Sequence, residues 1–285
     1  MSRAKATLIG FAAILQWSLL ALLTIGSAPV PPLLLNALCF GIGGFIGLVW
    51  VIATGQWAEL RKVPVGVYAF GALGLFGAHF LYFTAFRLAP AAETGLIAYL
   101  WPLLIVLLSG LLPGERLLRQ HLVGAALAFI GAALIVLRGA GAPGGAALPG
   151  YGVAFGFALV WAGYSVLSRR FGAVPTVSVT VYCLAAAVLS GIAHLALETT
   201  LWPQTPIGWG SVIALGIGPV GISFFNWDVG MKHGDIQLLG VAAYAAPLLS
   251  TVALVATGIT PASATIAIAA VLVVAGAAVA ARARR

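Results

Sequence analysis

The chain has 285 residues, of which 62% are hydrophobic and only 7% charged, and its mean hydropathy is +1.12. Charged residues make up roughly a quarter of an ordinary soluble domain, so this composition excludes one and indicates a protein that crosses a membrane several times. The net charge of +8 does not indicate a nucleic-acid partner, because the basic residues are scattered between apolar segments. The two cysteines, Cys39 and Cys183, lie in apolar runs without metal-binding spacing, so we expect no metal and no cofactor.

Ten apolar segments follow one another along the chain, and each is predicted to cross the bilayer, which takes roughly 20 helical residues. Loop-forming runs such as GSAPVPP at 26–32 and PQTP at 203–206 separate them. Backbone polar groups cannot stay unpaired in lipid, so the sequence predicts an all-α membrane protein with ten transmembrane helices. In chain order the segments are Ala6–Ile25, Leu33–Ala53, Val65–Phe86, Ala91–Leu112, Leu122–Leu137, Gly150–Leu167, Val177–Leu197, Ile207–Val229, Ile236–Thr257 and Ala262–Ala281.

The positions of the basic residues predict the orientation of these segments. If the N-terminus is cytoplasmic, 12 of the 14 Lys and Arg residues fall on the cytoplasmic side, and only Arg87 and Arg138 fall on the other. Cytoplasmic connections carry such an excess of positive charge in membrane proteins. We therefore expect both termini in the cytoplasm and the uncharged stretch Gly139–Pro149 outside it.

The two halves of the chain match each other at an offset of 144 to 145 residues. Trp17 corresponds to Trp161, and a Tyr-x-x-Pro motif recurs at Tyr99 and Tyr244. Matches of such uncommon residues favour an internal duplication over chance, and five segments per half require the second copy to enter the membrane inverted. The predicted units are a first five-helix repeat at 1–138, an extracytoplasmic linker at 139–149 and an inverted second repeat at 150–285.

Prolines interrupt the fourth and ninth segments at corresponding places. Because proline has no N–H, Pro102 and Pro247 deprive the carbonyl groups of Ala98 and Ala243 of their helical partners. Such carbonyls near the middle of the membrane are candidate acceptors for a substrate ammonium group. The alternative is a structural kink whose carbonyl is satisfied by water or a nearby serine. Pro219, beside Gly218 in the eighth segment, is a candidate hinge.

Aromatic side chains are frequent near the middle of the predicted segments, although Trp and Tyr usually collect at membrane interfaces. Their polar groups need partners there, which favours a lined cavity; packing between helices is the alternative, above all for Phe224 and Phe225. His79 is the ionisable residue placed clearly in mid-segment, either in the cavity or bonded to a carbonyl group. The predicted substrate-binding residues are Trp17, His79, Tyr82, Ala98, Tyr99, Trp101, Trp161, Tyr164, Ala243 and Tyr244.

Charged residues are predicted near segment ends, where they would form ion pairs close to the surface. Arg87 stands near Glu93, Asp228 near Lys232, and His194 four residues before Glu198, which predicts a solvated pair. No Asp or Glu is predicted at mid-membrane, so we expect no carboxylate proton relay. Hydrolase, metalloprotease and nucleotide-binding motifs are missing from the sequence, so we expect neither an enzyme nor an ATP-driven pump.

The chain resembles the EamA branch of the drug/metabolite transporter superfamily, which also has five plus five inverted helices with kinked fourth and ninth helices. Within it, the stretch HFLYFTAFRLAPAAETGLIAYLWPLLIVLLSGLLPGERL is similar to YddG-type aromatic amino acid exporters. This resemblance implies a multi-pass protein of the bacterial inner membrane that exports aromatic and other neutral amino acids through a central cavity by alternating access.

Other functions fit the same sequence pattern. An exporter of other small metabolites or drugs would have the same fold, and a membrane channel or a small-molecule-sensing receptor would belong to a different class. The expected partners are a small-molecule substrate and the lipid bilayer, without nucleic acid. The oligomeric state stays open, and a monomer is consistent with the sequence.

Overall fold

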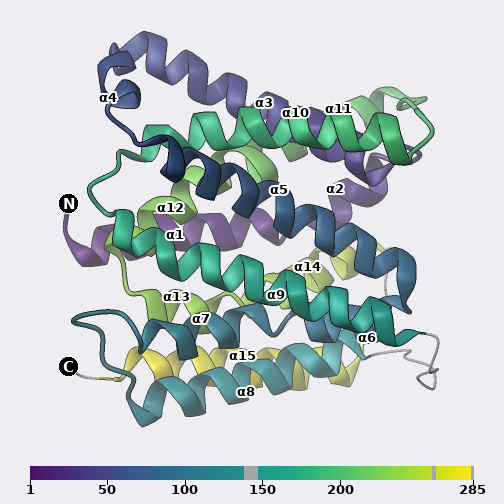
Figure 1. Cartoon of the computed structure of the whole chain (residues 1–285). Coiled ribbons are helices and arrows are strands. Elements are labelled where there is room, and N and C mark those ends of the chain that lie inside the picture. The colour runs from purple at the N-terminus through teal and green to yellow at the C-terminus, as the bar shows by residue number, and fades with distance from the viewer. Residues whose placement is uncertain (138–146, 259–260, 284–285) are drawn as a thin grey trace.

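A computed structural model describes residues 1–137, 147–258 and 261–283. Described residues are helical or lie in short connections, without β-strands, as expected of an all-α membrane protein (Figure 1). Most of the predicted linker Gly139–Pro149 falls outside the described residues. The α-helices are α1 (Arg3–Trp17), α2 (Leu20–Gly26), α3 (Pro32–Thr54), α4 (Trp57–Arg61), α5 (Val65–Leu88), α6 (Ala91–Ala98), α7 (Trp101–Ser109), α8 (Arg119–Val136), α9 (Leu148–Ser168), α10 (Val179–Leu197), α11 (Pro206–Ile217), α12 (Ser223–His233), α13 (Ile236–Ala242), α14 (Ala245–Ala256) and α15 (Ala264–Ala281).

Within the described ranges, eight helical stretches are long and apolar enough to cross a membrane. Two further apolar helical stretches, Thr94–Ser109 and Arg119–Leu134, are shorter. Each of the ten predicted segments therefore lies on helix, but the lengths support eight crossings and leave the fourth and fifth segments as a prediction.

Several of these stretches are interrupted, and three of the interruptions lie close to a proline, whereas the one between α1 and α2 falls at Ser18 and Leu19. α6 ends at Ala98 and α7 begins at Trp101, and α13 ends at Ala242 before α14 begins at Ala245. Between α11 and α12, the π-helical turn Gly218–Ile222 contains Pro219. A side chain on Gly221 would overlap the Gly216 carbonyl group and the backbone of α3, so this tight turn requires glycine.

The helices form stacked layers that share an aromatic interior. α3 packs on α10, α5 on α9, α1 on α12, and α8 on α15 (Figure 1). The main core contains most of the large aromatic side chains, and a second core, mostly of alanine and valine around Tyr244, lies among α7, α8, α13, α14 and α15. The start of α1 and the end of α15 lie at the same end of the molecule.

Candidate functional site

Five aromatic side chains from four helices meet in the main core, and we call them the aromatic cluster. The Trp17 ring lies edge-on to Trp101 at 6.1 Å, to Trp161 at 6.0 Å and to Phe224 at 6.3 Å. Trp227 is the nearest ring to Trp17, with centroids 4.9 Å apart. Edge-to-face rings at these distances attract one another, so the cluster holds α1, α7, α9 and α12 together.

Two indole N–H groups fix the rings of this cluster in place. Trp17 Nε1 donates to the Pro219 carbonyl oxygen at 3.0 Å and to Ser223 Oγ at 3.1 Å. Trp227 Nε1 donates to Ser165 Oγ at 3.0 Å. A buried indole without a partner would be costly, so these bonds select one orientation for each ring.

Further aromatic residues extend the cluster along α5 and α9. Tyr164 stacks on Trp161 at 5.4 Å, and His79 lies 5.7 Å from Phe224. His79 Nδ1 lies 2.8 Å from the Leu75 carbonyl oxygen of its own helix. This contact fits the alternative in which His79 is bonded to a carbonyl group. Tyr82 packs instead against Phe86 and Phe157, one turn further along α5.

The two predicted kinks lie close together in the fold but have different surroundings. Ala98 and Ala243 are both buried at the helix breaks. Tyr99 is half-buried, whereas Tyr244 is fully buried and accepts a hydrogen bond from the Leu103 amide at 3.1 Å. The first amides of a helix lack partners within it, so Tyr244 completes the start of α7 and lies in the second core rather than in the aromatic cluster.

The structure therefore brings Trp17, Trp101, Trp161 and Tyr164 together, with His79 beside them. Tyr82, Tyr99 and Tyr244 lie outside the aromatic cluster. Sequence reasoning missed Trp227 and assigned Phe224 to packing. The repeat offset of 145 would have found both, because it relates Phe224 to His79 and Trp227 to Tyr82.

The described charged pairs near the helix ends are more buried than expected. The side chain of Glu93, the predicted neighbour of Arg87, lies outside the described part of the structure. Glu198 and His194 pair at 2.9 Å, but their side chains are only 3% and 4% exposed, so the predicted solvated pair is wrong. Arg87 pairs with Glu198, and the amides of Leu33 and Leu34 donate to the same carboxylate. Helix α3 begins there, and the amides of its first turn, which have no partner within the helix, favour a negative charge at this position.

These contacts set the pKa of Glu198, which lies just beyond the end of α10. Burial raises this pKa, and hydrogen bonds from His194, from the α3 amides of Leu33 and Leu34 and from Arg87 lower it. The hydrogen bonds prevail, and the pKa of Glu198 lies below its ordinary value. The carboxylate is therefore ionised at neutral pH and ties α3, α5 and α10 together.

Asp228 and Lys232 form an ion pair at 2.9 Å, as their spacing predicted, but in the interior rather than at the surface. Both side chains are at most 2% exposed, and Thr176 Oγ1 also donates to Asp228 at 2.7 Å. Each charge of this buried pair therefore has a partner, which indicates a structural role.

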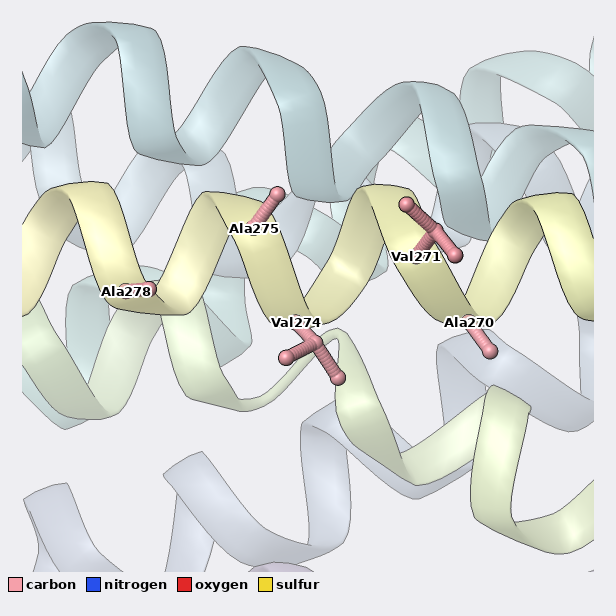
Figure 2. Close-up of a pocket in the computed structure, with 5 residues that line it drawn as sticks. All are labelled: Ala270, Val271, Val274, Ala275 and Ala278. Carbon is pink, nitrogen blue, oxygen red and sulfur yellow. The ribbon is translucent and has the colours of Figure 1, made fainter.

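Figure 2 shows a shallow apolar hollow on the outer face of α15. Val271 and Val274 there are 68% and 64% exposed, and the lining side chains, which also include Ala270, Ala275 and Ala278, carry no polar atom. Such a surface suits lipid chains rather than a charged solute. Among the described residues, no group of His, Cys, Asp and Glu could hold a metal ion.

Comparison with known proteins gives consistent matches over nearly the whole chain. The sequence profile of the EamA-like transporter family matches residues 4–137 and 148–282. The aromatic amino acid exporter YddG of Ancylobacter novellus is 52% identical over 284 residues, 98% of each chain, and the Escherichia coli protein of that name is 28% identical over 88% of each chain. A crystal structure with 51% sequence identity covers 98% of both chains with a TM-score of 0.93.

Proposed function

The chain belongs to the EamA-like transporter family, and from this premise we propose that it exports aromatic and other neutral amino acids across the bacterial inner membrane. Its family and its apolar helices make it a multi-pass membrane transporter. Two relatives that match most of its length are named as aromatic amino acid exporters. The substrate class, the alternating-access mechanism and the site are our proposal.

The aromatic cluster carries this proposal. It joins α1 and α7 from the first half to α9 and α12 from the second, so a substrate held there would contact both halves. Aromatic faces suit apolar side chains and attract an ammonium group by about 0.5–2 kcal/mol each. The proposed site comprises the cluster with His79 and Tyr164, and Tyr82 and Tyr99 at its edge.

The carbonyl groups at the two helix breaks are the proposed acceptors for the substrate ammonium group. Ala98 and Ala243 lie at these breaks, and Pro102 and Pro247 lie in the first turn of the helices that follow. Contrary to the expectation from the sequence, the Ala243 carbonyl oxygen accepts a hydrogen bond from the Ala246 amide at 3.1 Å, so only its second lone pair is open to a substrate. Asp228, which follows the cluster residue Trp227 in the sequence, is already paired with Lys232 at 2.9 Å. We therefore propose transport without a carboxylate proton relay.

We further propose ten spans arranged as two inverted repeats, at 1–138 and 150–285, with both termini cytoplasmic and 139–149 outside. The packing supports this arrangement, because several contacts between spans have a counterpart five spans away. The contact of α5 with α9 corresponds to that of α12 with α1. The contact of α3 with α11 corresponds to that of α10 with α5, and the contact of α7 with α9 to that of α13 with α1. In this arrangement α6–α7 and α8 are the fourth and fifth spans.

Counterflow in proteoliposomes tests the function. Vesicles loaded with unlabelled phenylalanine should transiently accumulate labelled phenylalanine, because a carrier exchanges the two through one site. A channel or a receptor would give no such overshoot, and an exporter of other metabolites would show it only with those compounds. Absence of counterflow with every neutral amino acid would overturn the proposed substrate class.

A further inference from the structure

A second cluster of polar side chains connects the helices that carry the aromatic cluster, at the end of the molecule where α1 begins. We call it the end network, and its centre is Glu115 in the connection between α7 and α8. Arg169 Nη2 donates to Glu115 Oε1 at 2.6 Å, and Gln237 Nε2 donates to Glu115 Oε2 at 3.1 Å. The Glu115 side chain is only 4% exposed.

Arg169 and Arg3 extend the end network to further elements. Arg169 Nη1 donates to the carbonyl oxygens of Met231 and Gly234, each at 2.9 Å. Arg3 lies at ion-pair distance from Glu115, 3.6 Å, and from Asp235, 3.2 Å. The end network therefore links the start of α1, the α7–α8 connection, the end of α9 and the α12–α13 junction.

These are the same helices that carry Trp17, Trp101, Trp161 and Trp227. Half of the contacts in the end network also cross between the halves of the chain. They join Glu115 to Arg169, Glu115 to Gln237, and Arg3 to Asp235. The described ion pair at the opposite end, Arg87–Glu198, also joins the two halves, but it connects α5 to α10, which carry none of the five rings of the aromatic cluster. The end network thus joins the helices of the aromatic cluster directly at the end of the molecule where α1 begins.

We propose that Glu115 and Arg169 are the gate residues that close the cytoplasmic mouth of the aromatic site, and that substrate enters when the end network separates. This inference rests on the proposed function for its orientation and its substrate. A site between two halves opens at one end only if the contacts joining them there break. Once open, the gate exposes these charged groups to water, and their hydration offsets the lost ion pairs.

Accessibility of a buried cysteine tests the gate without any substrate. Ile105 is fully buried, one turn beyond Trp101 on α7 toward Glu115, and therefore lies behind the gate. In a background where Cys39 and Cys183 are replaced by alanine, Ile105→Cys is exposed to a hydrophilic maleimide from the cytoplasmic side of inside-out vesicles. Labelling should be slow when this background carries Ile105→Cys and no further substitution.

Glu115→Gln should speed this labelling by about tenfold, because Arg169 then loses its buried counter-charge and the closed state is destabilised. Glu59→Gln is the matched control, since Glu59 pairs with Lys62 at 2.7 Å in an exposed position within one half of the chain. Gln237→Glu should act like Glu115→Gln, because it places a second carboxylate beside Glu115.

The gate is disproved if folded Glu115→Gln and Gln237→Glu proteins label no faster than Glu59→Gln. A lower melting temperature without faster labelling would show a purely structural network and would also overturn it. If both variants misfold, the same criterion applies to Arg3→Gln, whose side chain is already 38% exposed. Labelling needs no substrate, so it tests the gate even if the proposed substrate class is wrong. Counterflow tests the substrate class independently.

Discussion

The indole nitrogen of Trp17 lies 3.0 Å from the carbonyl oxygen of Pro219, a residue 202 positions later in the chain. This bond connects the centre of the aromatic cluster to the π-helical turn between α11 and α12. Ser223 Oγ shares the same indole N–H at 3.1 Å and donates its own proton to the Pro219 carbonyl oxygen. The position of the Trp17 ring and the shape of this turn therefore depend on one another.

We predict that Ser223→Ala impairs recognition of aromatic substrates. The Trp17 ring loses one of its two acceptors, so its orientation is less fixed, and KM for phenylalanine should rise about threefold, as expected for one lost hydrogen bond. Ser190→Ala is the control, because Ser190 is also buried and hydrogen-bonded, to Asn36 on α3. Equal KM changes in both variants would contradict the positioning role.

Trp161→Ala should weaken transport of aromatic amino acids more than transport of alanine. The substitution removes a large aromatic face that contacts Trp17, Trp101 and Phe224. KM for phenylalanine should increase by about tenfold relative to alanine. Uptake into vesicles measures this ratio, and Trp202→Ala, at an exposed tryptophan, should leave it unchanged. An unchanged ratio in folded Trp161→Ala would place the site elsewhere.

Tyr244→Phe should reduce stability without changing substrate selectivity. The hydroxyl group accepts the Leu103 amide at the start of α7, and its loss leaves a buried donor without that acceptor, at a cost of about 1 kcal/mol. Unfolding in mixed detergent measures the change, with Tyr99→Phe as the corresponding variant of the first half. A selectivity change in Tyr244→Phe with unaltered stability would instead favour the substrate-contact role predicted from the sequence.

Glu198 should make the protein sensitive to acid. Its pKa in the fold lies below the ordinary value of 4.5, so its contribution to stability is complete above that value. It is lost as pH falls through the lower pKa of the folded state. The melting temperature in detergent should therefore drop below about pH 4.5, and Glu198→Gln should flatten this part of the profile. Glu59→Gln, at an exposed carboxylate, should retain it.

Single-cysteine labelling in intact spheroplasts should confirm the proposed topology. With Cys39 and Cys183 replaced by alanine, Gln204→Cys in the α10–α11 loop should react with an impermeant maleimide, because this loop is predicted outside. Lys62→Cys, in the connection before α5, should react only after permeabilisation. The reverse pattern would show that the positive-inside count had assigned the orientation wrongly.

The sequence alone determined the class of protein and the positions of the helices. Lipid leaves the backbone few ways to satisfy its hydrogen bonds, so apolar length and loop chemistry are enough to locate helical segments. Proline acts locally, through its missing N–H, and the helices are therefore interrupted near Pro102, Pro219 and Pro247 as expected. The family resemblance was equally visible, because it depends on the order of residues along the chain.

Only the tertiary structure decided which side chains meet. Tyr244 shares its motif with Tyr99 but faces the second core, because the direction of a side chain depends on how its helix is rotated against its neighbours. The charged residues show the same limit, since Arg87 pairs with Glu198, 111 positions away. The sequence suggests pairs between residues that are close along the chain. A buried charge needs a partner, however, and the fold decides which residues come into contact with it. The end network around Glu115 could therefore be found only in the tertiary structure.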